Sequence, residues 1–113
     1  MKKQLLILSR GDIIKVSFDP IIGHEQAGYR PALVISDTIF HRSTGFALCL
    51  PITSRKKGLF FEIEIETKNI TGVALPHGTR MLDLQNRNFI FVERAPKDAL
   101  QKAQVILSKI ISE

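Results

Sequence analysis

The chain has 113 residues, of which 44% are hydrophobic and 24% are charged, a balance typical of globular domains and not of disordered segments. Its longest apolar runs hold only four or five residues, so we expect neither a membrane-spanning helix nor a signal peptide. Sixteen Lys and Arg against eleven Asp and Glu give a net charge of +5, and the whole surplus lies within residues 1–60. Such a surplus suits a polyanionic partner, although it also serves solubility alone. We expect one cytoplasmic domain over residues 1–113.

Short segments with the composition of β-strands alternate with turn residues over the first ninety positions. A polar, glycine-bearing loop over residues 19–30 separates the first two segments. A single helical turn fits residues 37–44, and a basic loop covers residues 53–58. The predicted strands cover residues 12–18, 31–36, 46–52, 60–66, 72–75, 79–84 and 89–92.

The fourth of these segments, residues 60–66, alternates strictly between apolar and acidic side chains. In a strand, this pattern places alternate side chains on opposite faces of the sheet. We therefore expect an inward face of Phe61, Ile63 and Ile65, and a solvent-exposed face, away from any nucleic acid, of Glu62, Glu64 and Glu66.

The hydrophobic period changes after residue 95. From residue 96 to residue 112 the apolar side chains recur at helical spacing along one face. Pro96 suits the first helical position, and Asp98 complements the positive end of the helix dipole. The predicted fold class is mainly β with α (α+β): a small, highly curved antiparallel sheet or barrel closed by a C-terminal helix.

Two polar clusters follow or precede apolar strands. Residues 23–31 (GHEQAGYRP) bring an imidazole, a carboxylate, an amide and a guanidinium together, and residues 51–58 (PITSRKKG) hold two hydroxyl groups and three cations. Rigid strands that present polar loops are a common way to build a site. A structural salt bridge at Arg30 and a solvated basic face at residues 55–57 would explain the same residues.

Metal and nucleotide chemistry have no support in the sequence. The three histidines are widely spaced, and no pattern of the HxxxH, CxxC or GxGxxG type occurs. The single cysteine, Cys49, has no partner for a disulfide and lies in an apolar strand, where we expect a buried and inert thiol. We predict no metal site and no cofactor.

Several motifs, in this order, resemble the MazF/PemK toxins: RGDI at residues 10–13, FDP at 18–20, GHEQAGYRPALV at 23–34, PIT at 51–53 and GVAL at 72–75. The resemblance extends from about residue 10 to residue 111. It implies a homodimeric, SH3-like barrel of the kind shared with the CcdB toxin. It also implies a sequence-specific, metal-independent endoribonuclease of a type II toxin–antitoxin system, which an acidic antitoxin holds inactive.

By motif, the resemblance assigns catalysis to Arg30 and Thr53, and His24 and Glu25 match loop residues of some members. One dipeptide departs from the family, since His-Gly at 77–78 stands where relatives commonly carry Asp-Gln. His77 is therefore a candidate for proton transfer. Such enzymes use the ribose 2′-hydroxyl as the nucleophile and leave a 2′,3′-cyclic phosphate and a 5′-hydroxyl.

Basic, polar and aromatic residues beside these motifs are candidates for RNA contact. Cations would neutralise phosphates, and a base could stack on Tyr29 or Phe60, although core packing is the more ordinary role of an aromatic side chain. The predicted RNA-binding residues are Gln26, Tyr29, Ser54, Arg55, Lys56, Lys57 and Arg80.

The expected partners are single-stranded RNA, an acidic cognate antitoxin and a second copy of the chain, with no membrane. Two alternatives stay open. One is a catalytically degenerate RNA-binding relative, in which the His-Gly dipeptide abolished turnover, and the other is a CcdB-like toxin that poisons gyrase by binding. Neither alternative cleaves RNA, so cleavage that depends on Arg30 and Thr53 would separate the nuclease from both, and a gyrase supercoiling assay would separate the two alternatives from each other.

Overall fold

The computed structural model describes residues 7–19 and 29–112. They form seven antiparallel strands, two α-helices and one short 3-10 helix. In chain order these are β1 (Asp12–Ser17), β2 (Tyr29–Val34), α1 (Thr38–Thr44), β3 (Phe46–Thr53), β4 (Ile63–Glu66), β5 (Thr71–Ala74), η1 (Pro76–Gly78), β6 (Arg80–Asp83), β7 (Phe89–Arg94) and α2 (Lys97–Ile111). No described helix has the length and apolar character needed to cross a membrane.

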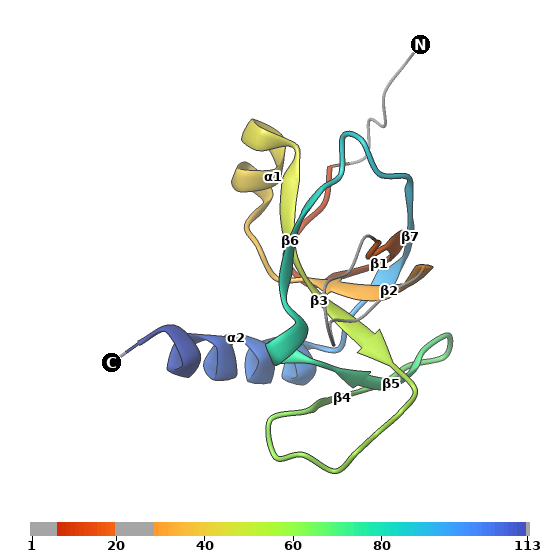
Figure 1. The fold of residues 1–113 in the computed structure, drawn as a ribbon, viewed down its shortest axis with the longest axis vertical. Helices are drawn as coiled ribbons and strands as arrows, with labels where there is room; N and C mark the ends of the chain where they lie inside the picture. Colours follow the sequence, from red (N-terminus) through yellow and green to blue (C-terminus); the bar gives the residue numbers. More distant parts are fainter. Residues whose placement is uncertain (1–6, 20–28, 113) are drawn as a thin grey trace.

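The strands form one strongly curled sheet in the order β4-β5-β3-β2-β1-β7 (Figure 1). β3 pairs with β2 along one edge, and with β6 and then β5 along the other. Helix α1 contacts β3 at one end of the molecule, and α2 lies beside β4 (Figure 1). The predicted architecture, a small curved antiparallel sheet with a C-terminal helix, is confirmed.

Apolar side chains are buried on both faces of the central strands. In β1, Ile14 and Val16 pack into one core cluster while Ile13 packs into the other. In β2, Ala32 and Leu33 divide in the same way. The second cluster also contains two buried alanines of α2, because small side chains let a helix approach a sheet closely. The continuous apolar runs that predicted buried strands at residues 31–36 and 46–52 therefore fill both clusters.

Two ends of predicted elements differ in the structure. Pro96 is the N-cap of α2 with extended backbone, so the helix begins one residue later than its expected position, at Lys97. The strand predicted over residues 60–66 begins only at Ile63. Ile63 and Ile65 are buried and Glu64 and Glu66 are exposed, as predicted, whereas Glu62 is only 5% exposed. The prediction that Glu62 faces solvent is wrong because it precedes the strand.

The two aromatic residues considered for base stacking lie on the surface. Tyr29 is 57% exposed at the start of β2, and Phe60 is 91% exposed in the turn before β4. Core packing, the more ordinary role for an aromatic residue, is therefore wrong for both. The Phe60 ring lies nearly perpendicular to the ring of Phe61, with a centroid separation of 5.3 Å.

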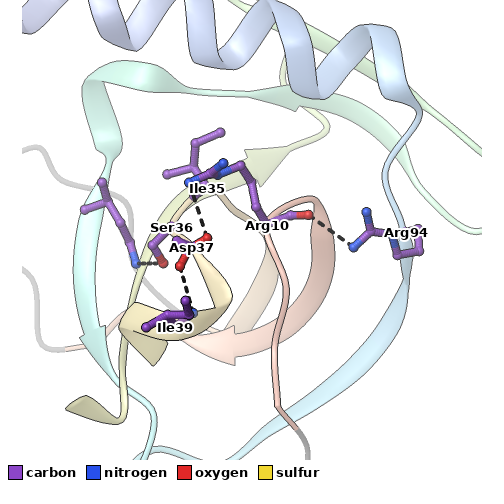
Figure 2. A network of polar contacts seen from close by, with 7 residues as sticks. Arg10, Ile35, Ser36, Asp37, Ile39 and Arg94 are labelled. Carbon is purple, nitrogen blue, oxygen red and sulfur yellow. Dashed lines mark hydrogen bonds and ion pairs between the residues drawn. The ribbon is translucent and has the colours of Figure 1, made fainter. Parts of the chain in front are cut away.

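Arginine side chains tie the start of β1 to the segment that follows β2 (Figure 2). The Arg10 Nε donates to the carbonyl oxygen of Ile35 at 3.0 Å. Arg94 Nη1 donates to the carbonyl oxygen of Arg10 at 3.1 Å and to the carboxylate of Asp12 at 2.8 Å. Asp37, in the same network, caps α1 by accepting from the Ile39 amide at 2.8 Å. These bonds fix one end of β1 independently of the strand ladder.

Candidate active site

A cavity of about 310 Å³ opens where β2, the end of β3 and η1 meet. Its walls contain residues of both polar clusters, 23–31 and 51–58, and of the His-Gly dipeptide at 77–78, which departs from the family pattern. The lining residues are Arg30, Thr53, Arg55, Lys57, Leu59, Glu62, Leu75 and His77. Three cations and one carboxylate therefore surround this cavity, which suits an anionic ligand.

Strand pairing positions Arg30 and Thr53. Arg30 is paired with Val16 in the β1–β2 ladder, and Thr53 is the last residue of β3, paired with Val73 of β5. The Thr53 hydroxyl oxygen accepts a hydrogen bond from the Arg55 amide at 3.2 Å. Its hydrogen can still donate to a bound group, because a hydroxyl both accepts and donates.

Gly72 allows β5 to approach Thr53 closely. A Cβ atom at this position would lie 2.4 Å from the Thr53 carbonyl oxygen and 3.0 Å from its carbonyl carbon, which is closer than any side chain tolerates. The atoms that this Cβ would meet belong to the main chain of Thr53, the residue to which the motif assigns catalysis. A larger residue at position 72 would therefore displace Thr53.

His77 reaches the cavity from η1. The turn is fixed to β3, because the Leu75 amide donates to the Pro51 carbonyl oxygen at 2.9 Å. The Thr79 hydroxyl closes the same turn onto the Pro76 carbonyl oxygen at 2.6 Å. The imidazole packs edge-on against the ring of Phe61, with centroids 5.2 Å apart. The structure thus brings His77 into the same cavity as Arg30 and Thr53.

Glu62 is a charged lining residue that the sequence analysis did not predict as part of the site. One of its carboxylate oxygens accepts from the Lys57 amide and the other from the Gly58 amide, each at 3.1 Å. These two bonds explain its burial, because a buried carboxylate needs donors. The alternating pattern of residues 60–66 continues through Glu62 and gave no sign that the strand starts after it.

The other predicted RNA-binding residues that the structure describes lie outside the cavity lining. Ser54 is exposed on the loop after β3, and Lys56 forms an ion pair with Glu64. Tyr29 lines a separate hollow, together with Ser17 and Arg87. The guanidinium of Arg80 donates to the carbonyl oxygen of Phe18 and lies 6.0 Å from the centroid of that ring. His24, Glu25 and Gln26 lie outside the described residues.

Cys49 is fully buried in β3, as predicted. Burial raises the pKa of its thiol to about 12, so the thiolate does not form at neutral pH. Within residues 7–19 and 29–112, no group of three or more His, Cys, Asp or Glu side chains could hold a metal ion. The polar groups available in the described cavity are a guanidinium, a hydroxyl, an imidazole, two further cations and the carboxylate of Glu62.

Residues 9–111 match the family described as PemK-like, MazF-like toxin of type II toxin-antitoxin system. The chain belongs to this family. A curated relative, the endoribonuclease toxin MazF of Escherichia coli K12, is 48% identical over 65 residues, which are 58% of this chain and 59% of the relative. That match spans less than two thirds of the relative's length. The endoribonuclease toxin ChpB of the same strain is 36% identical over 108 residues, covering 90% of this chain and 92% of the relative.

Solved structures of family members share the whole fold. The crystal structure of MazF from Deinococcus radiodurans superposes with a TM-score of 0.89 at 34% identity, covering 94% of this chain and 97% of that chain. A MazE–MazF crystal structure from the same organism gives a TM-score of 0.82 at 34% identity, covering 94% and 96%. The fold and the motif resemblance therefore agree along almost the entire toxin-family domain.

Proposed function

We propose that this toxin-family protein is a sequence-specific, metal-independent endoribonuclease that cleaves single-stranded RNA and thereby inhibits translation and growth. The observation that carries the proposal is the convergence of Arg30, Thr53 and His77 on one cationic cavity. These residues come from three separate segments of the chain, and the two that the family motif marks as catalytic lie together. The endoribonuclease names of its curated relatives support the same reaction.

In the proposed reaction the ribose 2′-hydroxyl attacks the adjacent phosphorus and the 5′-oxygen leaves. A base removes the proton of the 2′-hydroxyl, and an acid protonates the departing oxygen. Arg30 holds two phosphate oxygens through its planar fork and stabilises the extra negative charge of the transition state. Thr53 donates its hydroxyl hydrogen to the same phosphate. The products are a 2′,3′-cyclic phosphate and a 5′-hydroxyl.

The proton transfers fall to groups that both accept and donate. His77 is the imidazole of the described cavity, and His24 and Glu25, from the motif loop outside the described residues, are the further candidates. Arg55 and Lys57 bind the phosphates that flank the cleaved bond, with Ser54, Lys56 and Arg80 nearer the periphery. Tyr29 and Phe60 are exposed aromatic rings on which a splayed base can stack.

The positive cavity also fits an acidic antitoxin segment, which inhibits by occupying the RNA site. Solved MazE–MazF complexes of a family member support a protein antitoxin as the partner. We further propose that the toxin acts as a homodimer in the cytoplasm, and that residues 1–113 form its single domain.

The decisive experiment incubates the purified protein in EDTA with a long single-stranded RNA and maps the 5′ ends of the fragments. We expect discrete cuts with 5′-hydroxyl ends, and loss of cutting when the nucleotide at the cut carries a 2′-deoxy sugar. Arg30→Ala and Thr53→Ala should each lower the cleavage rate roughly a hundredfold or more. Arg42→Ala, an exposed arginine on α1, is the matched control and should leave the rate unchanged.

Intact RNA after incubation with folded protein would reject the nuclease. RNA binding without cleavage would then identify the degenerate relative. Inhibition of gyrase supercoiling, unaffected by Arg30→Ala, would identify the gyrase-poisoning alternative.

A further inference from the structure

Two consecutive main-chain amides of the loop after β3 converge on one carboxylate. The Lys57 and Gly58 amides donate to the two oxygens of Glu62, each at 3.1 Å, and Gly58 has a φ of +78°. Successive amides arranged in this way, with a left-handed residue among them, form a concave site that binds an anion. Here the anion is a side chain of the same loop. The Glu62 amide closes the turn by donating to the Leu59 carbonyl oxygen at 3.1 Å.

The same loop carries two of the three cations that line the cavity. Arg55 and Lys57 are exposed side chains, and among the described residues neither forms an ion pair. Their positions therefore depend on the loop backbone. That backbone is held at its start by the Arg55 amide on the Thr53 hydroxyl, and at its end by Glu62.

We propose that Glu62 is a positioning residue, whose buried carboxylate fixes the loop so that Arg55 and Lys57 face the phosphates of a bound RNA. The inference rests on the proposed function for the identity of the ligand. Glu62 acts through the loop, because its two carboxylate oxygens accept the Lys57 and Gly58 amides of the segment that carries the cavity cations.

Without this anchor, the loop must be ordered each time RNA binds. Fixing one residue's backbone costs enough conformational entropy to weaken binding about tenfold. The contact of two cations with phosphates also becomes intermittent. For a single strand, the slope of log K against log salt changes by about 0.7 for each phosphate contact. Losing both contacts should therefore make the salt dependence shallower by about 1.4.

The test measures binding of a fully 2′-O-methylated single-stranded RNA, which cannot be cleaved, as a function of KCl concentration. We expect Glu62→Ala to weaken binding about tenfold and to reduce the salt slope. Glu66→Ala is the matched control, because Glu66 is an exposed carboxylate on β4 that lies outside the cavity lining. It should change neither quantity.

A double-mutant cycle separates positioning from general stability. In protein that already carries Arg55→Ala and Lys57→Ala, Glu62→Ala should have no further effect on binding. With cleavable RNA, Glu62→Ala should raise KM about tenfold and leave kcat within about twofold, since Arg30 and Thr53 remain. If Glu62→Ala fails to fold, Glu62→Gln, which keeps one acceptor oxygen, should show the same direction at smaller size.

Three results would overturn the inference: an effect of Glu62→Ala that persists without Arg55 and Lys57, an unchanged salt slope, or a fall in kcat at constant KM. If wild-type protein binds the methylated RNA but does not cleave unmodified RNA, the proposed nuclease is rejected. The double-mutant cycle on RNA binding would then decide the role of Glu62. Wild-type protein that binds no RNA would reject both.

Discussion

Cationic side chains serve two different purposes in this member of the toxin family. The framework arginines, Arg10, Arg80, Arg87 and Arg94, all donate to main-chain carbonyl oxygens. The cavity cations, Arg30, Arg55 and Lys57, instead line a hollow that is open to solvent. A count of positive charge cannot separate the two groups, because a guanidinium satisfies a carbonyl oxygen as readily as a phosphate.

The framework arginines act at both ends of β1. Arg10 and Arg94 fix its start (Figure 2), and Arg80 and Arg87 donate to carbonyl oxygens of residues 17–19 at its end. These bonds join segments far apart in the chain, whereas the cavity cations come from β2 and one loop. Substitutions in the framework should therefore change stability, and those in the cavity should change catalysis.

The largest effect should come from Arg30. Arg30→Ala removes the phosphate clamp and lowers the cleavage rate roughly a hundredfold or more. Arg30→Lys keeps the charge but loses the planar fork, so it should recover only part of the rate. Single-turnover cleavage by folded protein measures both. Full activity in Arg30→Lys would show that charge alone suffices and that the two-oxygen clamp is wrong.

Gly72 lies where the framework meets the cavity. Gly72→Ala places a methyl group against the Thr53 main chain, and such overpacking costs about 1–3 kcal/mol of unfolding free energy. It should also lower the cleavage rate of the folded protein, because Thr53 must move. Urea unfolding and cleavage assays on the same sample test both effects. Wild-type activity would mean that the position of Thr53 is not critical.

Arg94→Ala should lower stability and leave the cleavage rate nearly unchanged, whereas Arg30→Ala should lower the cleavage rate of folded protein. Arg94→Ala leaves the buried carboxylate of Asp12 without its charged partner, which costs about 1–3 kcal/mol of unfolding free energy. The cleavage rate per folded molecule should stay within about twofold of wild type. A loss of rate without a loss of stability would break the division between framework and cavity.

The smallest effect concerns the carboxyl of Asp83, beside the framework arginine Arg87. The Asn86 side chain, main-chain amides and the Arg87 charge lower its pKa. A carboxyl with a lowered pKa stabilises the folded state above its unfolded pKa, and this contribution is lost as pH falls through the folded value. Asn86→Ala should raise the pKa of Asp83, as measured by NMR titration of its carboxyl carbon. An unchanged pKa would show that the Asn86 hydrogen bond has no effect.

The spacing of hydrophobic residues predicted the strands and helices, because burying one face requires an apolar residue at every second position of a strand and at every third or fourth position of a helix. The motif resemblance, together with the polar loops next to the predicted strands, predicted Arg30, Thr53 and His77 as site residues. The structure places all three in one cavity. Glu62 was missed because the alternation of apolar and acidic residues begins at residue 61, in the loop, and continues unchanged into the strand that starts at Ile63. The hydrogen bond from Arg80, a predicted RNA contact, to the Phe18 carbonyl oxygen could not be predicted, because that acceptor lies 62 positions earlier in the chain. No local pattern reveals such a partner.

β3 pairs with β2, which precedes it in the chain, and with residues of β5 and β6 that follow their partners by about twenty to almost forty positions. Its second edge therefore stays open until β5 and β6 have been made and have docked. The cavity is completed at the same moment, because His77 lies between those two strands. During synthesis, a chain that has emerged only as far as Thr53 carries both motif residues but has no cavity. The fold thus completes this cavity only after most of the chain has been made.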